Sequence, residues 1–391
     1  MTPALSRRQA VAALASTATL PLIAGCTRPL AATPAAPKGA TLPARDQFAA
    51  VFHLDATAGQ LLALQPETAT SLGIDNGEFA FLRSALTDRS LQGQKNIADS
   101  LRGNLARFEG LDTSRLTHST RTSVEVVRSA YRTALEGFAF PYGDVAVGGW
   151  RNSPYVVIQN VGAYLDIPRF LDSEHQVKTA ADAEAWLARL ASYPAQLDGE
   201  LERMRQARAA GMIPPGFLID TAIKQMEASI RSAREGGSLV EQIQTKTRDI
   251  PGNWADRARL IVTGQVAPAL ERQLAELRLQ RAAATDIPGM WSRPQGEAYY
   301  RWAAKAATTT TMSPDEIHEL GIDTLRTLHA QMDTILRGLG YTQGTVGQRM
   351  LALSKDQRFR FPDNDQGRAE VLAVIQQRIA IIRAKMPQAF N

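Results

Sequence analysis

The chain has 391 residues, of which 44% are hydrophobic, and 44 basic side chains stand against 39 acidic ones. A composition of this kind belongs to a globular protein with enough apolar residues for a large buried core, which excludes an intrinsically disordered chain. The formal charge of +5 is spread along the sequence without a run of like charges. We therefore expect no nucleic-acid partner.

The N-terminus has the pattern of an export signal. Arg7 and Arg8 precede the apolar run 11–22, and the small residues Ala24 and Gly25 lie directly before Cys26. A twin arginine before a short apolar run is typical of an export signal, and small residues before a cysteine are typical of a lipoprotein cleavage site. We predict that residues 1–25 are a twin-arginine lipoprotein signal peptide and that Cys26 is acylated after cleavage. Removal of this segment lowers the formal charge from +5 to +3.

Two alternatives for this region remain open. Cys26 is the only cysteine, so it cannot form an internal disulfide, but it could be a buried free thiol. Ordinary cleavage near Ala31 and Ala32 would instead release a soluble periplasmic protein. The apolar run is too short for a spanning helix. The predicted location is therefore the cell envelope, on the periplasmic side of a membrane, with the N-terminal lipid as the membrane contact.

Residues 26–45 are rich in proline and alanine and have no apolar periodicity, which predicts a tether. Beyond it, apolar residues recur at helical spacing. Ser313 as N-cap, Pro314 in the first turn and Glu316 closing a capping box give the strongest helix start, and Pro194 predicts a kink or break. The predicted helices include residues near 48–62 and 124–135, then 181–212, 217–235, 254–284, 296–307, 313–337 and 366–386.

Strand patterns are few. Residues 144–147 and 155–159 are short β-prone runs, and the second is also compatible with a helix. The glycine-rich stretch between them predicts a loop. The predicted fold is mostly α, an irregular bundle of long helices with few short strands, in one domain over residues 46–391.

No familiar catalytic motif occurs in the chain. It has no Gly-x-Ser-x-Gly elbow, no phosphate-binding glycine loop and no dinucleotide fingerprint. His318 is followed by Glu319, but Ile322 stands where a second zinc ligand one helical turn away would be required. We interpret His318 and His329 as helix-surface or packing residues, and we assign no catalytic, cofactor-binding or metal residue. The five histidines are His53, His118, His175, His318 and His329.

One long segment resembles a known bacterial family. Residues 152–164 read Asn-Ser-Pro-Tyr-Val-Val-Ile-Gln-Asn-Val-Gly-Ala-Tyr and are followed by Ile-Pro-Arg-Phe-Leu at 167–171. This pattern resembles the family known as domain of unknown function 885. The resemblance continues, in order, through residues 181–184, 211–215, 296–300, 308–311 and 313–321. It covers the chain from about Asp46 to the end and implies a mostly helical, exported protein similar to zinc metallopeptidases of the gluzincin type.

In that family the metal site consists of a His-Glu-x-x-His helix and a downstream glutamate in the C-terminal part. This sequence has no such motif, so it resembles the N-terminal part of the family only. The resemblance implies that this chain holds no cofactor, with zinc expected only in full-length members.

Whether the chain is an enzyme is left open. One hypothesis is a lipid-anchored, peptide hydrolase-like protein that is inactive by itself and whose helices form one wall of a substrate cleft. The other is a non-enzymatic envelope module that binds a peptide or a partner protein. The last predicted helix adds a structural question, because its apolar stripe from Val371 to Met386 requires a partner surface. We expect this helix to be frayed or to promote association, unless it packs onto the preceding helices.

Overall fold

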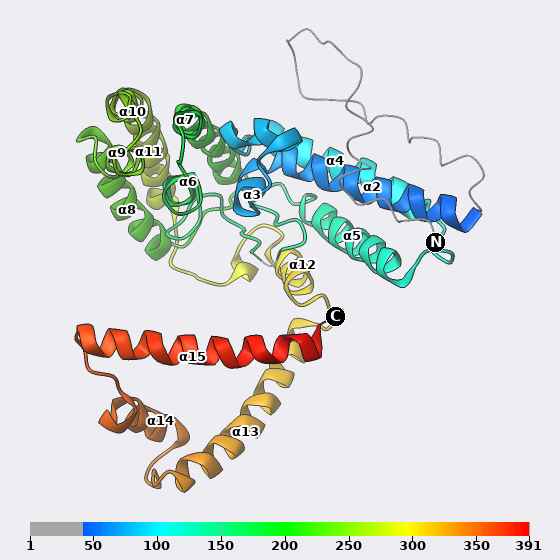
Figure 1. Cartoon of the computed structure of the whole chain (residues 1–391), viewed down its shortest axis with the longest axis vertical. Helices are drawn as coiled ribbons and strands as arrows, with labels where there is room; N and C mark the ends of the chain where they lie inside the picture. The colour runs from blue at the N-terminus through cyan, green and yellow to red at the C-terminus, as the bar shows by residue number, and fades with distance from the viewer. Residues whose placement is uncertain (1–41, 150, 391) are drawn as a thin grey trace. The chain divides into compact units, whose positions relative to one another are not determined.

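The computed structural model describes residues 42–149 and 151–390 (Figure 1). The predicted signal residues Arg7, Arg8 and Cys26 and most of the predicted tether lie outside this part of the chain. Two compact units are present: unit 1 extends to Trp302, and unit 2 extends from Ala303. Residues 46–391, expected as one helical domain, lie in both units.

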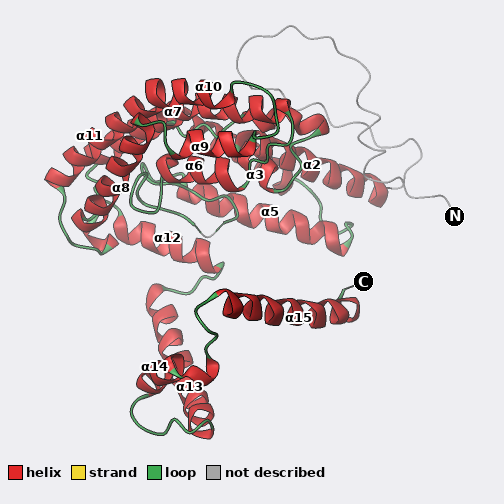
Figure 2. Cartoon of the chain, turned by 60° about the vertical axis from the view of Figure 1, so that its left-hand side comes forward, coloured by secondary structure: helices red, strands yellow, loops and turns green. Residues whose placement is uncertain are grey.

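Nearly all regular structure in the described residues is helical, which confirms the mostly α fold (Figure 2). The two segments expected to be strands form only isolated bridges, between Asp144 and Ser153 and between Ile158 and Val161. Gly143 and Gly148 adopt φ values of +83° and +67°, so the chain turns before a longer ladder can form. The β-prone composition of these segments was therefore a poor guide to their structure.

Three long helices pack together at one end of unit 1 (Figure 1). Ile97, Leu101 and Leu105 lie on one face of α4 and pack against Tyr131 and Ala134 of α5. α2 begins at Leu42, so the last four residues of the expected tether, 42–45, are helical. We call this part the first lobe, and its elements are α2 (Leu42–Leu64), α3 (Pro66–Ser71), η1 (Gly77–Ser84), α4 (Leu91–Glu109) and α5 (His118–Gly137).

The remaining helices of unit 1, apart from α12, form a second lobe with the largest core of the molecule. Its centre is α7, whose side chains of Trp186, Leu190 and Leu197 are fully buried. Each such side chain contributes about 1.5–3 kcal/mol by leaving water. The elements are α6 (Ala163–Ser173), α7 (Ala180–Ala209), α8 (Gly216–Arg234), α9 (Ser238–Lys246), α10 (Trp254–Ile261), the π-helical turn η2 (Val262–Val266) and α11 (Ala267–Ala283).

α7 runs through Pro194 without a break, so of the kink or break expected there the break does not occur. Proline removes one hydrogen-bond donor from the helix, but Leu190 and Leu197 on either side are both fully buried, and this packing holds the helix together. The start of α7 is fixed by a capping box between Thr179 and Asp182. Its end is followed by Gly211, which has a φ of +77°.

The chain then passes through η3 (Met290–Ser292) and α12 (Gly296–Thr308), which crosses the boundary into unit 2. In unit 2 the capping box of Ser313 and Glu316 forms as predicted. Arg349 of α14 is buried and forms an ion pair with Asp333 of α13. The elements of unit 2 are α13 (Pro314–Gly338), α14 (Val346–Lys355), η4 (Gln357–Phe359) and α15 (Asp365–Ala389).

α15 forms as a helix, but its apolar stripe is not covered by the other described residues of unit 2. The side chains of Leu372, Ile375, Ile379, Ile382 and Met386 are 45–59% exposed. Packing of this stripe onto the preceding helices of unit 2 is therefore not observed. Among the described residues, no helix is both long and apolar enough to cross a membrane.

Candidate ligand-binding cleft

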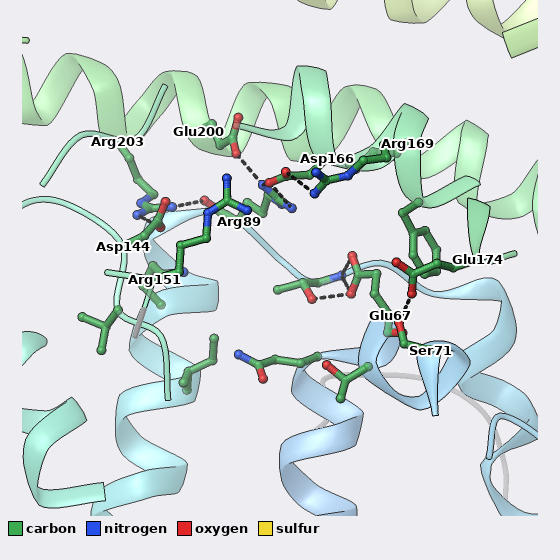
Figure 3. Close-up of a pocket in the computed structure, with 18 residues that line it drawn as sticks. Glu67, Ser71, Arg89, Asp144, Arg151, Asp166, Arg169, Glu174, Glu200 and Arg203 are labelled. Atoms are coloured by element: carbon green, nitrogen blue, oxygen red, sulfur yellow. Dashed lines mark hydrogen bonds and ion pairs between the residues drawn. The ribbon is translucent and has the colours of Figure 1, made fainter. Parts of the chain in front are cut away.

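A cleft of about 540 Å³ opens in unit 1 where the two lobes meet (Figure 3). The first lobe contributes α3, the start of α4 and the segment between η1 and α4, and the second lobe contributes α6 and α7. Charged side chains of both signs line it. The acidic residues are Glu67, Asp144, Asp166, Glu174 and Glu200, and the basic residues are Arg89, Arg151, Arg169 and Arg203.

A buried ion pair joins the two lobes at the cleft. Glu200 of α7 is 1% exposed and accepts a hydrogen bond of 2.9 Å from Nη1 of Arg89. The same arginine lies 3.3 Å from a carboxylate oxygen of Asp166 in α6. Glu200 also accepts from the backbone N–H of Ala163, at 2.8 and 3.0 Å, and from Nε2 of Gln273, at 3.3 Å. Both carboxylate oxygens of Glu200 therefore accept hydrogen bonds, as a buried carboxylate requires.

Glycine 199 allows α7 to approach the first lobe closely enough for this pair to form. A Cβ atom at Gly199 would lie 2.8 Å from the backbone nitrogen of Ser90, closer than side-chain carbons approach in real structures. Ser90 caps α4 by accepting from the N–H of Gly93, and Arg89 directly precedes it. The helix cap and the close approach together fix the position of Arg89.

Burial and charge act in opposite directions on this pair. Burial alone lowers the pKa of Arg89, but Glu200 and Asp166 raise it by more, so the guanidinium remains charged. Burial is the largest influence on the pKa of Glu200 and raises it, while Arg89 opposes that effect. The Arg89–Glu200 ion pair is therefore a fixed structural feature of the cleft. The carboxylate oxygens of Glu200 are occupied by hydrogen bonds within the protein and are not free to bind a ligand.

Arg203 fixes the segment that follows α5. Its side chain is 5% exposed and forms an ion pair with Asp144. It donates to the carbonyl oxygens of Gly143, at 2.6 Å, and Arg89, at 3.3 Å. Gly143 is required here because a Cβ atom would lie 2.4 Å from the carbonyl oxygen of Ser153.

The opposite side of the cleft is built from α3. Glu67 accepts from the backbone N–H of Thr87, at 3.0 and 3.1 Å, and from its hydroxyl, at 2.5 Å. Ser71 donates to Glu174, which follows α6. These acidic side chains therefore have partners within the protein.

Arg151 differs from the other three arginines of the cleft. It donates to the carbonyl oxygen of Asn160, at 2.7 Å, and no described carboxylate lies within ion-pair distance of it. Arg169, by comparison, lies 3.4 Å from Asp166. Figure 3 shows the side chain of Arg151 extending into the cleft. A guanidinium without a carboxylate partner can bind an incoming carboxylate through two parallel hydrogen bonds.

The structure does not bring the histidines together. His318 and His329 are exposed on α13, as predicted for surface residues, and their separation of eleven residues corresponds to about 16 Å along a helix. His175 is buried beside Arg189 in unit 1. Within residues 42–149 and 151–390, no group of three or more His, Cys, Asp or Glu side chains could hold a metal ion. The described residues therefore do not fit the zinc that the sequence resemblance implies for full-length proteins.

The sequence patterns did not identify the charged residues of the cleft as candidate site residues. One available signal was the position of Glu200, which lies three residues after Leu197 and four before Met204, within the apolar stripe of α7. A charged residue in such a stripe must have a buried partner. The sequence gives no indication that this partner is Arg89, 111 positions away.

The family model described as "Bacterial protein of unknown function (DUF885)" matches residues 66–391. The chain belongs to this family. A search of the solved structures found similarity to a crystal structure from Colwellia psychrerythraea that is described as a "putative lipoprotein". The two chains have 24% sequence identity and a TM-score of 0.78, over 86% of this chain and 58% of the other, so they share a fold. This chain therefore spans somewhat more than half the length of that protein. Among curated proteins, no sequence match was found.

Proposed function

We propose that this protein is an exported, lipid-anchored envelope protein of the DUF885 family that binds peptides in the polar cleft of unit 1. The observation that supports this proposal is Arg151, a guanidinium without a carboxylate partner among the described residues, in a cleft whose other three arginines each form an ion pair with a carboxylate. A peptide offers a terminal carboxylate for Arg151 and backbone groups for neutral donors and acceptors such as Gln65 and Gln94. A few fixed polar groups in a cleft of this size are typical of ligand sites.

The cleft fits a role as one wall of a substrate site in a peptide hydrolase-like protein, which the sequence resemblance implies. The alternative is a binding module without chemistry, and both predict peptide binding. Both also predict that this chain alone leaves the peptide intact, because the hydrolase-like protein is expected to be inactive by itself. Incubation of the full chain with zinc and a peptide mixture, followed by mass spectrometry, tests this expectation. Bound but intact peptides agree with it, whereas cleavage that is lost with a chelator would contradict it.

Replacement of Arg151 by glutamine tests the binding site. The change removes a charge-assisted hydrogen bond to the ligand carboxylate, which is worth about 1.5–3 kcal/mol. We therefore expect about 10- to 100-fold weaker binding of short peptides with a free C-terminus. Isothermal titration calorimetry on the full chain measures this change, and an amidated peptide should bind weakly to both proteins.

Arg231→Gln is the matched control because Arg231 is exposed on α8, which contributes no residue to the cleft. Its affinity should equal that of the unchanged protein. Equal affinity of the Arg151 variant and the control would show that the cleft does not hold the carboxylate.

The membrane anchor is tested at Cys26. Replacement of Cys26 by alanine removes the thiol that would be acylated, so the protein should move from the membrane fraction to the soluble envelope fraction. Exchange of Arg7 and Arg8 for two lysines should block export if the twin-arginine route is used. Cell fractionation and immunoblotting measure both effects. Unchanged membrane association of an exported Cys26→Ala protein would contradict the anchor.

A further inference from the structure

A second cavity of about 400 Å³ adjoins the polar cleft in unit 1. It lies between α4 and the segment that follows α5. Gln94, Val145 and Arg203 line both cavities. Because Arg203 is 5% exposed and bonded to Gly143 and Asp144, it is a fixed wall common to both spaces. The shared residues place the second cavity directly beside the polar cleft.

The walls of the second cavity are apolar and aromatic. Leu91 and Ala98 line it from α4, and Phe138, Phe140 and Tyr142 line it from the opposite side. This lining contrasts with the polar cleft, where nine charged side chains meet. Rigid aromatic walls favour the burial of an apolar or aromatic side chain.

α12 packs against the aromatic wall of the second cavity, which consists of Phe138, Phe140 and Tyr142. The ring of Phe140 lies 5.3 Å from that of Tyr299 and 5.9 Å from that of Trp302, measured between centroids. Trp302 packs so closely on α5 that a Cβ atom at Gly137 would lie 2.1 Å from its ring. Its indole N–H also donates to the carbonyl oxygen of Thr133, at 2.8 Å. The wall therefore does not need to be ordered by the ligand, which reduces the entropic cost of binding.

The outer rim of the second cavity is polar, which limits the length of its occupant. Asp99 of α4 forms ion pairs with Lys95 and Arg102, and all three residues line the cavity. A long acyl chain would have to cross these charges to continue outward. A single side chain would fit within the apolar part.

From this geometry we infer that the second cavity is a side-chain subsite that accepts an apolar or aromatic residue of a peptide whose carboxylate binds Arg151. This inference rests on the proposed peptide binding and specifies its substrate class. The preferred ligands are short peptides that combine a free C-terminus with a bulky apolar residue.

The test uses the full chain and N-acetylated tripeptides with a free carboxylate. One peptide contains only glycine, and three others carry one phenylalanine at the first, second or third position. We expect at least one phenylalanine peptide to bind about tenfold more tightly than the glycine peptide, because it buries a large apolar side chain. Leu91→Glu should abolish this preference without changing the affinity for the glycine peptide.

Val126→Glu is the control for Leu91→Glu, because Val126 is 60% exposed on α5 and lines neither cavity. It should retain the preference for phenylalanine. Binding that depends on Arg151 but not on phenylalanine would overturn the subsite and leave the proposed function intact. Absence of any peptide binding would overturn both. Tight binding of decanoate that is sensitive to Leu91→Glu, without a phenylalanine preference, would assign the cavity to acyl chains and also overturn the inference.

Discussion

Arg189 and His175 show how a single buried contact fixes a protonation state. Arg189 is fully buried and donates to the carbonyl oxygens of Ala85, at 2.9 Å, and Leu82, at 3.0 Å. It also donates to Nδ1 of His175, at 2.8 Å. Because a guanidinium can only donate, Nδ1 must accept, and the proton of the neutral ring is then on Nε2, which faces the carbonyl oxygen of Asp182 at 3.3 Å.

This contact predicts that unit 1 loses stability in acid. Burial first, and then the charge of Arg189, lower the pKa of His175 from its usual value of 6.5 to about 4. Below pH 6.5 the unfolded chain binds a proton that the folded chain does not bind, so stability falls until about pH 4. The total loss for this shift is about 3 kcal/mol. Urea unfolding at several pH values measures it through tryptophan fluorescence, because all five tryptophans precede Ala303.

His175→Gln is the informative variant because an amide oxygen can accept from Arg189 but does not titrate. Its stability should depend less on pH between 6.5 and 4 than that of the unchanged protein. His53→Gln is the comparison, since the pKa of His53 is also lowered, by burial and by Arg107. Equal pH dependence of the His175 variant and the unchanged protein would assign the acid sensitivity to other groups.

At the scale of the elements, the sequence predicted helices best where a local signal marks their ends. Ser313, Pro314 and Glu316 form the start of α13 as expected, since a capping box depends only on neighbouring residues. Of the kink or break expected at Pro194, the break is absent, because distant helices bury the residues around it. α4 was not predicted, although Ile97, Leu101 and Leu105 recur at helical spacing.

The cleft could be predicted much less well, because its residues come from segments far apart in the chain. Arg89 precedes α4, whereas its partner Glu200 lies in the middle of α7. The segment 152–164 indicated the family, but its similarity to other sequences did not show that Arg151 beside it would lack a carboxylate partner. Pairing of this kind depends on the packing of the two lobes, which no local pattern encodes.

At the scale of the whole molecule, the exposed stripe of α15 is the feature with the clearest consequence. Leu372, Ile375, Ile379, Ile382 and Met386 are separated alternately by three and four residues, which places them along one seam of the helix. They are 45–59% exposed, so they form an apolar surface in water. Such a surface favours association with another apolar surface, including the same helix in a second copy.

We therefore predict that the full chain associates with itself through α15 as its concentration rises. Two glutamates, introduced by Ile375→Glu and Ile382→Glu, place charges in the seam and should shift the protein to monomers in analytical ultracentrifugation. The unfolding of unit 1, followed by tryptophan fluorescence, should not change. Leu260→Glu, at a 73% exposed position of α10, is the control and should leave association unaltered.

Hydrogen exchange gives an independent measurement of the same seam. If contact between copies covers α15, its backbone N–H groups between Val371 and Met386 should be protected at high concentration and exchange quickly at low concentration. The reason is that an isolated helix without a packed face opens readily in water. Strong protection of this segment in a dilute, monomeric sample would contradict the prediction, because it would show that α15 packs within its own chain.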